Sequence, residues 1–218
     1  MHSLIIANGT LPPPDFVRAL VRFAKMIVCA DGGANHAQTL GIKPDVIIGD
    51  FDSILPSTKI FFDNVLQLHL EEQFSTDLEK AIRHCIELGV SSVDIVGAFG
   101  DRIDHATGSL GCFKKFGNKI NIRMLDSFGE LTMIQKEVHL EMKVYEKVSL
   151  IPLERCTGVT TKNLKYELND GILELGVQEG ISNEAISRNV TIHVGTGILL
   201  LYRFHGWKLQ SPNHPAHL

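Results

Sequence analysis

The stretch Pro44-Asp45-Val46-Ile47-Ile48-Gly49-Asp50-Phe51-Asp52-Ser53 decides the fold prediction. Residues 46–48 form an apolar, β-branched run that is typical of a buried strand, and Gly49 ends it. Asp50 and Asp52 follow at a spacing of two, which in an extended segment points both side chains the same way. Two neighbouring carboxylates need a cation, and oxygen ligands favour Mg²⁺. The alternative is a solvated turn, because Gly-Asp and Asp-Ser pairs are common in turns.

Apolar runs and segments of helical spacing alternate on either side of this stretch. The expected strands are residues 4–7, 26–30, 46–48, 65–70, 93–96 and 120–125; the expected helices begin near residue 15 and cover 34–40, 76–88 and 104–116. This alternation predicts an α/β fold with a mostly parallel sheet and helices on both faces.

Polar clusters follow four of the expected strands. They are Asn8-Gly9, Asp31-Gly32-Gly33, Asp50 with Asp52, and Gly97-Ala98-Phe99-Gly100. Ligands of parallel sheets bind beyond the carboxyl ends of the strands, so we expect these clusters to converge on one edge. Their repeated position after strands favours a binding site over unconnected turns.

The residue pattern of the sequence changes after about residue 127. Helical spacing fades, and short strand-like runs alternate with turn residues such as Asn169-Asp170-Gly171 and Gly195-Thr196-Gly197. This pattern predicts an antiparallel β-sandwich of about 90 residues. We therefore expect two domains, residues 1–128 and 129–218.

Composition narrows the class of protein. The chain has 218 residues, of which 44% are hydrophobic, and a formal net charge of -4, which argues against a nucleic-acid-binding surface. The N-terminus shows no secretory signal, and no apolar run is long enough to span a membrane. The four cysteines lie far apart and are expected to be reduced. These features predict a cytoplasmic protein that binds neither nucleic acid nor membrane.

Charged side chains stand at the starts of two expected helices. Thr76-Asp77-Leu78-Glu79 has the form of a capping box, so helix capping alone can explain Asp77. Lys80 in the same first turn opposes the helix dipole unless it faces an anion such as a phosphate. Arg102 can bind phosphate oxygens through its forked guanidinium. Asp104 is expected either to cap the second helix or to bind metal or substrate.

Six motifs together make the sequence similar to the thiamine pyrophosphokinase family. They are the stretch quoted above, Cys29-Ala30-Asp31-Gly32-Gly33-Ala34-Asn35, Ser75-Thr76-Asp77-Leu78-Glu79-Lys80-Ala81, Arg102-Ile103-Asp104-His105, Asn163-Leu164-Lys165-Tyr166-Glu167-Leu168 and Gly180-Ile181-Ser182-Asn183-Glu184. The resemblance implies an ATP:thiamine pyrophosphotransferase that acts as a homodimer with thiamine bound between subunits. It also implies an ATP- and Mg²⁺-binding catalytic domain followed by a thiamine-binding β-sandwich.

The resemblance assigns roles to matched positions. It implies Mg²⁺ binding by Asp50, Asp52 and Asp77, and catalytic roles for these acids with Lys80, Arg102 and Asp104. The residues expected around the nucleotide are Asp31, Gly32, Asn35, Gln73, Thr76, Arg102 and His105. The residues expected at thiamine are Ser182, Asn183 and Trp207. The chain departs from the family's pattern at Asp101, where glycine is usual, and at Ser109, where asparagine is common.

Two other functions stay open. Asp50-Phe51-Asp52 after an apolar strand resembles the nucleophile motif of haloacid-dehalogenase-like phosphatases, which would make the chain a Mg²⁺-dependent phosphohydrolase with Asp50 as covalent nucleophile. That mechanism gives no role to Asp31, Asp77 or Arg102. A non-catalytic nucleotide or thiamine sensor is the other alternative.

Overall fold

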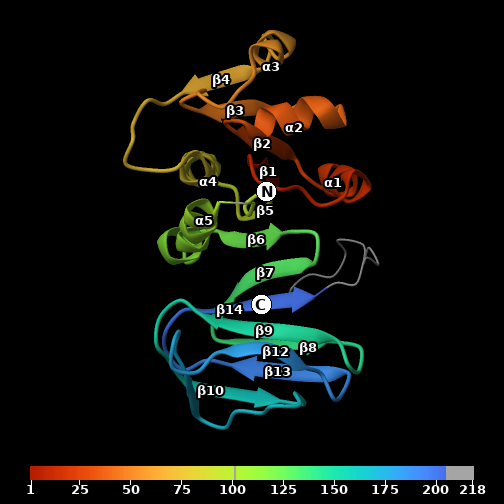
Figure 1. The fold of residues 1–218 in the computed structure, drawn as a ribbon, viewed down its shortest axis with the longest axis vertical. Helices are drawn as coiled ribbons and strands as arrows, with labels where there is room; N and C mark the ends of the chain where they lie inside the picture. Colours follow the sequence, from red (N-terminus) through yellow and green to blue (C-terminus); the bar gives the residue numbers. More distant parts are fainter. Residues whose placement is uncertain (101, 205–218) are drawn as a thin grey trace. The chain divides into compact units, whose positions relative to one another are not determined.

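Strands and helices alternate through the first of two units into which the chain divides, Met1–Ser127 and a second unit that begins at Phe128 (Figure 1). The computed structural model describes residues 1–100 and 102–204. The elements of the first unit are β1 (His2–Ile6), α1 (Pro14–Val21), β2 (Met26–Ala30), α2 (Gly33–Leu40), β3 (Val46–Gly49), α3 (Pro56–Phe61), β4 (Leu66–His69), α4 (Asp77–Glu87), β5 (Ser92–Val96), α5 (Ile103–Phe116) and β6 (Asn121–Leu125).

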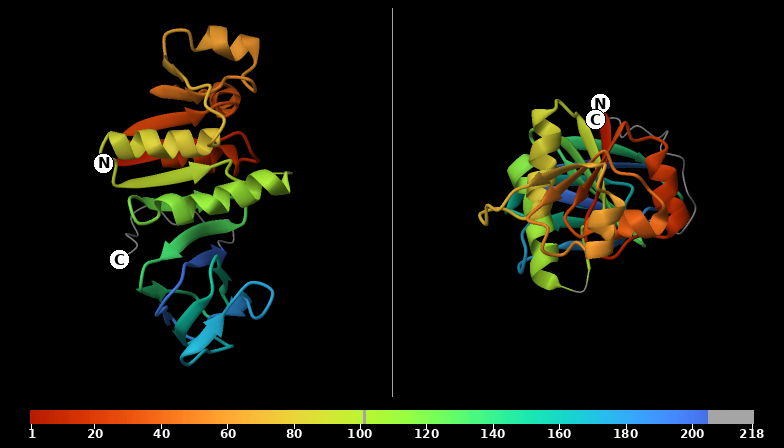
Figure 2. Two further views of the ribbon diagram at one scale, coloured as in Figure 1. Left: turned by 90° about the vertical axis from the view of Figure 1, so that its left-hand side faces the viewer. Right: turned by 90° about the horizontal axis from the view of Figure 1, so that it is seen from above.

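The strands of this unit form a parallel sheet in the order β6-β5-β1-β2-β3-β4. β1 lies in the middle, and its Leu4, Ile5 and Ile6 are completely buried, as expected for a strand covered on both faces. Figures 1 and 2 show α1 and α2 on one face of the sheet and α4 and α5 on the other. The predicted α/β architecture is confirmed.

Local details differ from the prediction at two places in this unit. The short helix α3 was not expected, because six residues are too few to show helical periodicity, although Pro56 at its first position is typical of a helix start. Asp104 does not cap α5: Arg102 occupies the N-cap position, and Asp104 lies inside the first turn. The helix that ends at Phe116 is α5, and its end agrees with the prediction from helical spacing.

The second unit is built from two antiparallel sheets. One has the order β12-β9-β14-β7 and the other β11-β10-β13-β8. The strands are β7 (Gly129–Ile134), β8 (Glu137–Glu141), β9 (Lys147–Pro152), β10 (Cys156–Lys162), β11 (Gly171–Leu173), β12 (Gly180–Glu184), β13 (Asn189–His193) and β14 (Leu199–Phe204). Apolar side chains of both sheets, among them Leu150, Leu201, Val159 and Ile192, form one core. The predicted antiparallel sandwich is confirmed.

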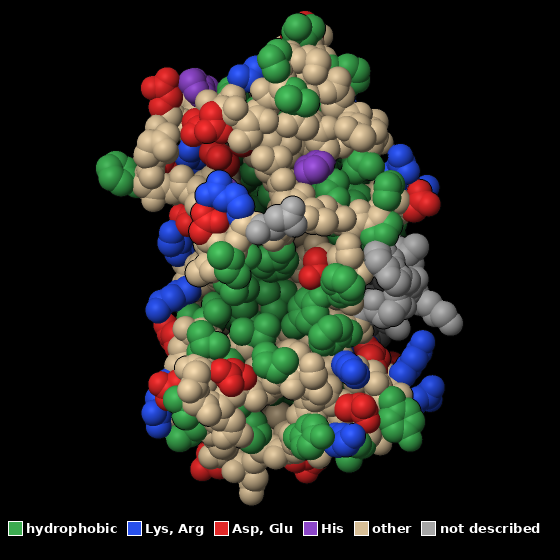
Figure 3. Space-filling model, in the orientation of Figure 1, with side chains coloured by type: hydrophobic (Ala, Val, Ile, Leu, Met, Phe, Trp, Pro, Cys, Tyr) green, Lys and Arg blue, Asp and Glu red, His purple; other side chains and the backbone are tan. Residues whose placement is uncertain are grey.

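The surface mixes charges of both signs. On the face drawn in Figure 3, Lys and Arg side chains lie interspersed with Asp and Glu side chains. Within the described residues, none of the helices has the length and apolar character needed to cross a membrane.

Candidate functional site

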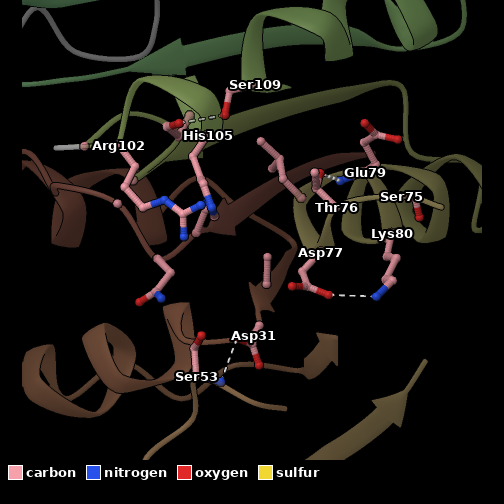
Figure 4. A pocket seen from close by; sticks show the side chains of 18 of the residues that line it. Asp31, Ser53, Ser75, Thr76, Asp77, Glu79, Lys80, Arg102, His105 and Ser109 are labelled. Atoms are coloured by element: carbon pink, nitrogen blue, oxygen red, sulfur yellow. Dashed lines mark hydrogen bonds and ion pairs between the residues drawn. The ribbon is translucent and has the colours of Figure 1, made fainter. Parts of the chain in front are cut away.

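A pocket of about 590 Å³ opens at the carboxyl ends of the strands of the first unit. Residues that follow β1, β2, β3 and β5 line it, together with the first residues of α4 and α5 (Figure 4). All four polar clusters expected from the sequence contribute to this wall: Asn8 and Gly9, Asp31, Asp50, and residues 97–100.

Glycine is required on one wall because two chain segments nearly touch. The Gly9 N–H donates to the Gly97 carbonyl at 2.8 Å, and a Cβ on Gly9 would lie 2.3 Å from the Phe99 carbonyl oxygen. No side chain fits into that space. This wall is therefore made of backbone, which can approach a ligand closely.

Three carboxylates meet in the same pocket. Ligand oxygens of Asp31, Asp50 and Asp77 all lie within 4.8 Å of one another. Gly49 permits this approach: its φ is +156°, and a Cβ there would lie 2.9 Å from the Asp31 Cβ and 3.2 Å from the Asp77 Oδ1. Strand β3 thus ends in the one residue type that lets acids from three chain segments gather.

The three acids differ in their surroundings. Asp31 is only 4% exposed, and its Oδ1 is buried without a hydrogen-bond partner. Burial raises the pKa of Asp31, and the charge of Asp77 adds to that rise. Burial also acts to raise the pKa of Asp50, but hydrogen bonds from the Asp52 N–H (3.2 Å) and Gln73 Nε2 (3.4 Å) outweigh it and lower that pKa. In this cluster the Asp31 carboxylate therefore has a buried oxygen without a partner, whereas hydrogen bonds already stabilise the ionised form of Asp50.

Asp52 is not a member of this group. Phe51 between the two acids has φ +65°, so the segment is not extended and the expected alternation of side chains is lost. Asp52 is exposed, and its Oδ1 accepts a hydrogen bond from the Ser53 hydroxyl at 2.8 Å. The premise that a spacing of two aligns Asp50 with Asp52 is wrong for this loop.

Lys80 pairs with one of the three acids. Its side chain is 2% exposed, and its Nζ donates to Asp77 Oδ1 at 2.9 Å and to the Leu70 carbonyl at 3.0 Å (Figure 4). The buried ammonium supplies the cation that Asp77 needs, and it fixes the end of β4 to α4. Lys80 also belongs to the pocket wall.

The start of α4 agrees with its sequence signal. Thr76 is the N-cap, and its hydroxyl accepts a hydrogen bond from the Glu79 N–H at 3.3 Å. The Glu79 carboxylate is buried and accepts from Lys115 Nζ at 2.6 Å, which joins α4 to α5. These bonds orient the N-terminus of α4, with its partial positive charge, toward the pocket wall that Thr76 and Asp77 form.

Arg102 and His105 line the pocket at the start of α5, whereas Asp104 does not. The Arg102 guanidinium donates to both carboxylate oxygens of Asp104, and its side chain is 69% exposed. This hydrogen bond lowers the pKa of Asp104 to about 2. An exposed guanidinium that a neighbouring carboxylate orients can bind an anion in the pocket.

Asn35 and Gly32 do not line the pocket. The Asn35 side chain donates to the Ser53 carbonyl (2.9 Å) and accepts from the Leu55 N–H (3.0 Å), so it holds the loop after β3. Gly32 is the N-cap of α2. Ser53 supports the site as well, because its N–H donates to Asp31 Oδ2 at 3.2 Å. Nothing in the sequence around Ser53 signals that contact, which depends on the fold of the loop.

The residues expected at thiamine lie in the second unit. Ser182 has φ +56°, and its N–H donates to the Ser149 hydroxyl at 2.9 Å. Asn183 is buried, and its side chain binds the backbone N–H and carbonyl of Tyr166 at 3.1 and 2.8 Å. Trp207 and Asp101 lie outside the described residues.

Comparison with known protein families identifies two consecutive matches. The catalytic domain of thiamin pyrophosphokinase matches residues 17–124, and the vitamin B1 binding domain of thiamin pyrophosphokinase matches residues 134–199.

Individual relatives agree with these matches. The chain is 31% identical over 180 residues to the thiamine pyrophosphokinase of Bacillus subtilis, covering 79% of this chain and 84% of the relative. It is 28% identical over 228 residues to thiamine pyrophosphokinase 1 of Arabidopsis thaliana, covering 91% and 84%. The crystal structure of the Bacillus subtilis thiamine pyrophosphokinase superimposes with a TM-score of 0.81 at 28% identity, covering 94% of this chain and 100% of that one.

Proposed function

The chain belongs to the thiamine pyrophosphokinase family, whose members make thiamine diphosphate from thiamine and ATP, and we propose that the pocket of its first unit catalyses this transfer. The supporting observation is the meeting of Asp31, Asp50 and Asp77 beside a buried lysine and an exposed arginine. The thiamine hydroxyl oxygen forms a bond to the β-phosphorus of ATP. The bond from that phosphorus to the oxygen bridging the α-phosphate breaks, AMP leaves with the electron pair, and the hydroxyl proton passes to a base.

The acid cluster fits a hard divalent cation. Its donors are all carboxylate oxygens, and the orphaned, buried Oδ1 of Asp31 lacks a positive partner. Asp31, Asp50 and Asp77 would hold Mg²⁺, and Asp52 stays a predicted ligand. Bound Mg²⁺ would withdraw negative charge from the phosphate oxygens.

The chain's own groups position the reactants. Lys80 fixes the carboxylate of Asp77, and Arg102 can exchange Asp104 for a phosphate oxygen. The backbone wall around Gly9 and the N-terminus of α4 add N–H groups that favour phosphate. Positioning and charge stabilisation are the main contributions that phosphoryl transfer requires of a protein.

Three parts of the prediction rest on the resemblance alone. Thiamine binding by Ser182, Asn183 and Trp207 is one, the homodimer is the second, and thiamine binding between subunits is the third; the cytoplasmic location stays a prediction from the sequence composition. The side-chain amide of Asn183 is already hydrogen-bonded to the backbone of Tyr166. We therefore propose that Asn183 shapes the thiamine site by holding the segment around Tyr166.

Product analysis tests the proposed reaction. Purified protein with ATP, Mg²⁺ and thiamine should yield AMP and thiamine diphosphate in equal amounts by mass spectrometry. Phosphate release without thiamine would instead support the phosphohydrolase. Tight ATP binding without AMP formation would support the sensor.

Variants of two acids test the site. Asp50→Asn should lower the rate by roughly a hundredfold to a thousandfold, because a charge-stabilising group is lost. Asp15→Asn is the matched control, since Asp15 is 93% exposed on α1 and forms an ion pair with Arg18 in the same helix. Asp52→Asn, made in parallel, shows whether the exposed acid joins the reaction. Full activity of Asp50→Asn would contradict the assignment.

A further inference from the structure

Phe74 is an aromatic residue held in water at the edge of the pocket. It lies in the loop between β4 and α4, belongs to the pocket wall and is 99% exposed. A phenylalanine ring normally gains stability by leaving water, so complete exposure is unfavourable for the free protein. Phe61 on α3 is also exposed, at 60%, but its ring packs edge-on against Phe62.

The loop around Phe74 is held by specific bonds. The Glu72 carboxylate accepts hydrogen bonds from the Phe74 N–H (3.0 Å) and the Ser75 hydroxyl, and Arg83 of α4 approaches it at 3.4 Å. These contacts and the N-terminal start of α4 fix the backbone on the C-terminal side of the ring.

The other side of the loop is held as well. Gln73 Nε2 bonds to the Glu71 carbonyl (3.3 Å) and to Asp50 Oδ2 (3.4 Å), and Lys80 holds the Leu70 carbonyl. The backbone that presents the ring is thus ordered before any ligand arrives, which lowers the entropy lost on binding.

The surroundings of the loop favour one of the two substrates. Gln73 and Asp77 flank Phe74 in the chain and both reach the acid cluster, where the phosphate chain would react. In an in-line transfer the acceptor approaches the β-phosphorus from the side opposite the departing AMP. Glu71 and Glu72 precede Phe74 closely in the chain, and their negative charges disfavour further phosphates there and favour a cation.

We propose that Phe74 binds the positively charged thiazolium ring of thiamine, by stacking and cation–π attraction, while the thiamine hydroxyl reaches the phosphate chain. Glu72 positions Phe74 for this contact. The inference rests on the proposed function, and it assigns the acceptor side of the pocket to the loop that carries Phe74.

Steady-state kinetics of Phe74→Ala test this role. The KM for thiamine should rise about tenfold, as expected for the loss of a ring–cation contact, while the KM for ATP stays within about twofold. Phe74→Tyr and Phe74→Trp should restore the KM for thiamine. Phe61→Ala is the matched control and should leave both constants unchanged.

A binding measurement separates affinity from turnover. Titration calorimetry with thiamine, in the presence of Mg²⁺ and α,β-methylene-ATP, should show the same loss for Phe74→Ala, because this analogue cannot release AMP. Glu72→Gln should weaken thiamine binding in the wild-type background but not in Phe74→Ala, because a positioning residue acts only through the ring it positions.

The outcomes separate this inference from the proposed function. An unchanged KM for thiamine, or a rise only in the KM for ATP, overturns the role of Phe74 while wild-type product formation leaves the function intact. A change in molar mass by light scattering for Phe74→Ala also overturns it, since the ring would then be a subunit contact. A wild-type protein that forms no AMP from ATP and thiamine refutes the proposed function itself.

Discussion

Asp31 carries the clearest conflict between stability and function at the scale of single residues. Its buried carboxylate has an unpartnered oxygen, and burial raises its pKa. A raised pKa means that the ionised form is less favourable in the folded protein than in the unfolded chain. The stability that the neutral form contributes is therefore lost as the pH rises through the folded-state pKa.

Asp31→Asn should accordingly raise the melting temperature of the metal-free protein at neutral pH. The difference from wild type should vanish below about pH 3, where the aspartate is neutral in both states because the ordinary pKa of aspartate is about 3.9. Mg²⁺ should raise the melting temperature of wild type but have little effect on the variant, which lacks a charged ligand. Scanning fluorimetry with and without Mg²⁺ measures both effects.

Asp63→Asn, at an exposed position of the same unit, serves as the control for Asp31→Asn and should change neither quantity. A variant that melts lower than wild type without metal, yet keeps its full response to Mg²⁺, would show that Asp31 is a structural residue.

The loop after β3 shows where prediction from residue types ends. Asp50 and Asp77 are recognisable because a strand end and a helix start are both visible in the sequence, and parallel strands bring such ends together. The separation of Asp52 from them depends on the left-handed φ of Phe51, a conformation that phenylalanine rarely adopts. Lys59 and His69 stabilise it by bonding the carbonyls of Phe51 and Asp50, contacts that only the folded chain brings together.

At the scale of whole elements, the helices and strands with a clear apolar pattern were the ones that the sequence predicted. The strands and helices that flank the site show continuous apolar runs or helical spacing, so their positions follow from the sequence. β12 (Gly180–Glu184) shows no apolar strand pattern in the sequence, because it is polar, lies at a sheet edge and interrupts its register with β9 between Gly180 and Asn183. Its residues were visible only as a motif.

Asn183 shows what that motif does for the fold of the second unit. The side chain binds the N–H and carbonyl of Tyr166 and also accepts from the Glu184 N–H at 2.9 Å. Asn183→Ala leaves these backbone groups without partners and should reduce the free energy of unfolding by about 1–3 kcal/mol. Urea denaturation, followed by circular dichroism, measures the loss.

Asn189→Ala is the control for Asn183→Ala, because Asn189 is exposed and accepts a hydrogen bond from the Asn163 side chain through its backbone carbonyl, which the substitution keeps. Wild-type stability of Asn183→Ala combined with a raised KM for thiamine would mean that this side chain serves the ligand directly.

At the scale of the whole molecule, both units have buried apolar side chains, and each unit contains at least one buried cysteine. Cys29, Cys85 and Cys112 lie in the first unit and Cys156 in the second; all four are free and buried. Burial raises the pKa of Cys85 and Cys112 to about 12 and that of Cys156 to about 11. At pH 8 almost none of these thiols is ionised in the folded protein.

Thiol labelling should therefore report the opening of each unit separately. Because the thiolate is the reacting species, native protein at pH 8 should react with iodoacetamide far more slowly than urea-unfolded protein, in which all four cysteines become accessible. Mass analysis of peptides after labelling at graded urea concentrations distinguishes Cys156 from the three cysteines of the first unit. Equal labelling of all four at one urea concentration indicates a single cooperative transition, and earlier labelling of Cys156 indicates that the sandwich opens first. Rapid labelling of any cysteine without urea would contradict the buried cores, since a thiol with so high a pKa reacts only after its surroundings open.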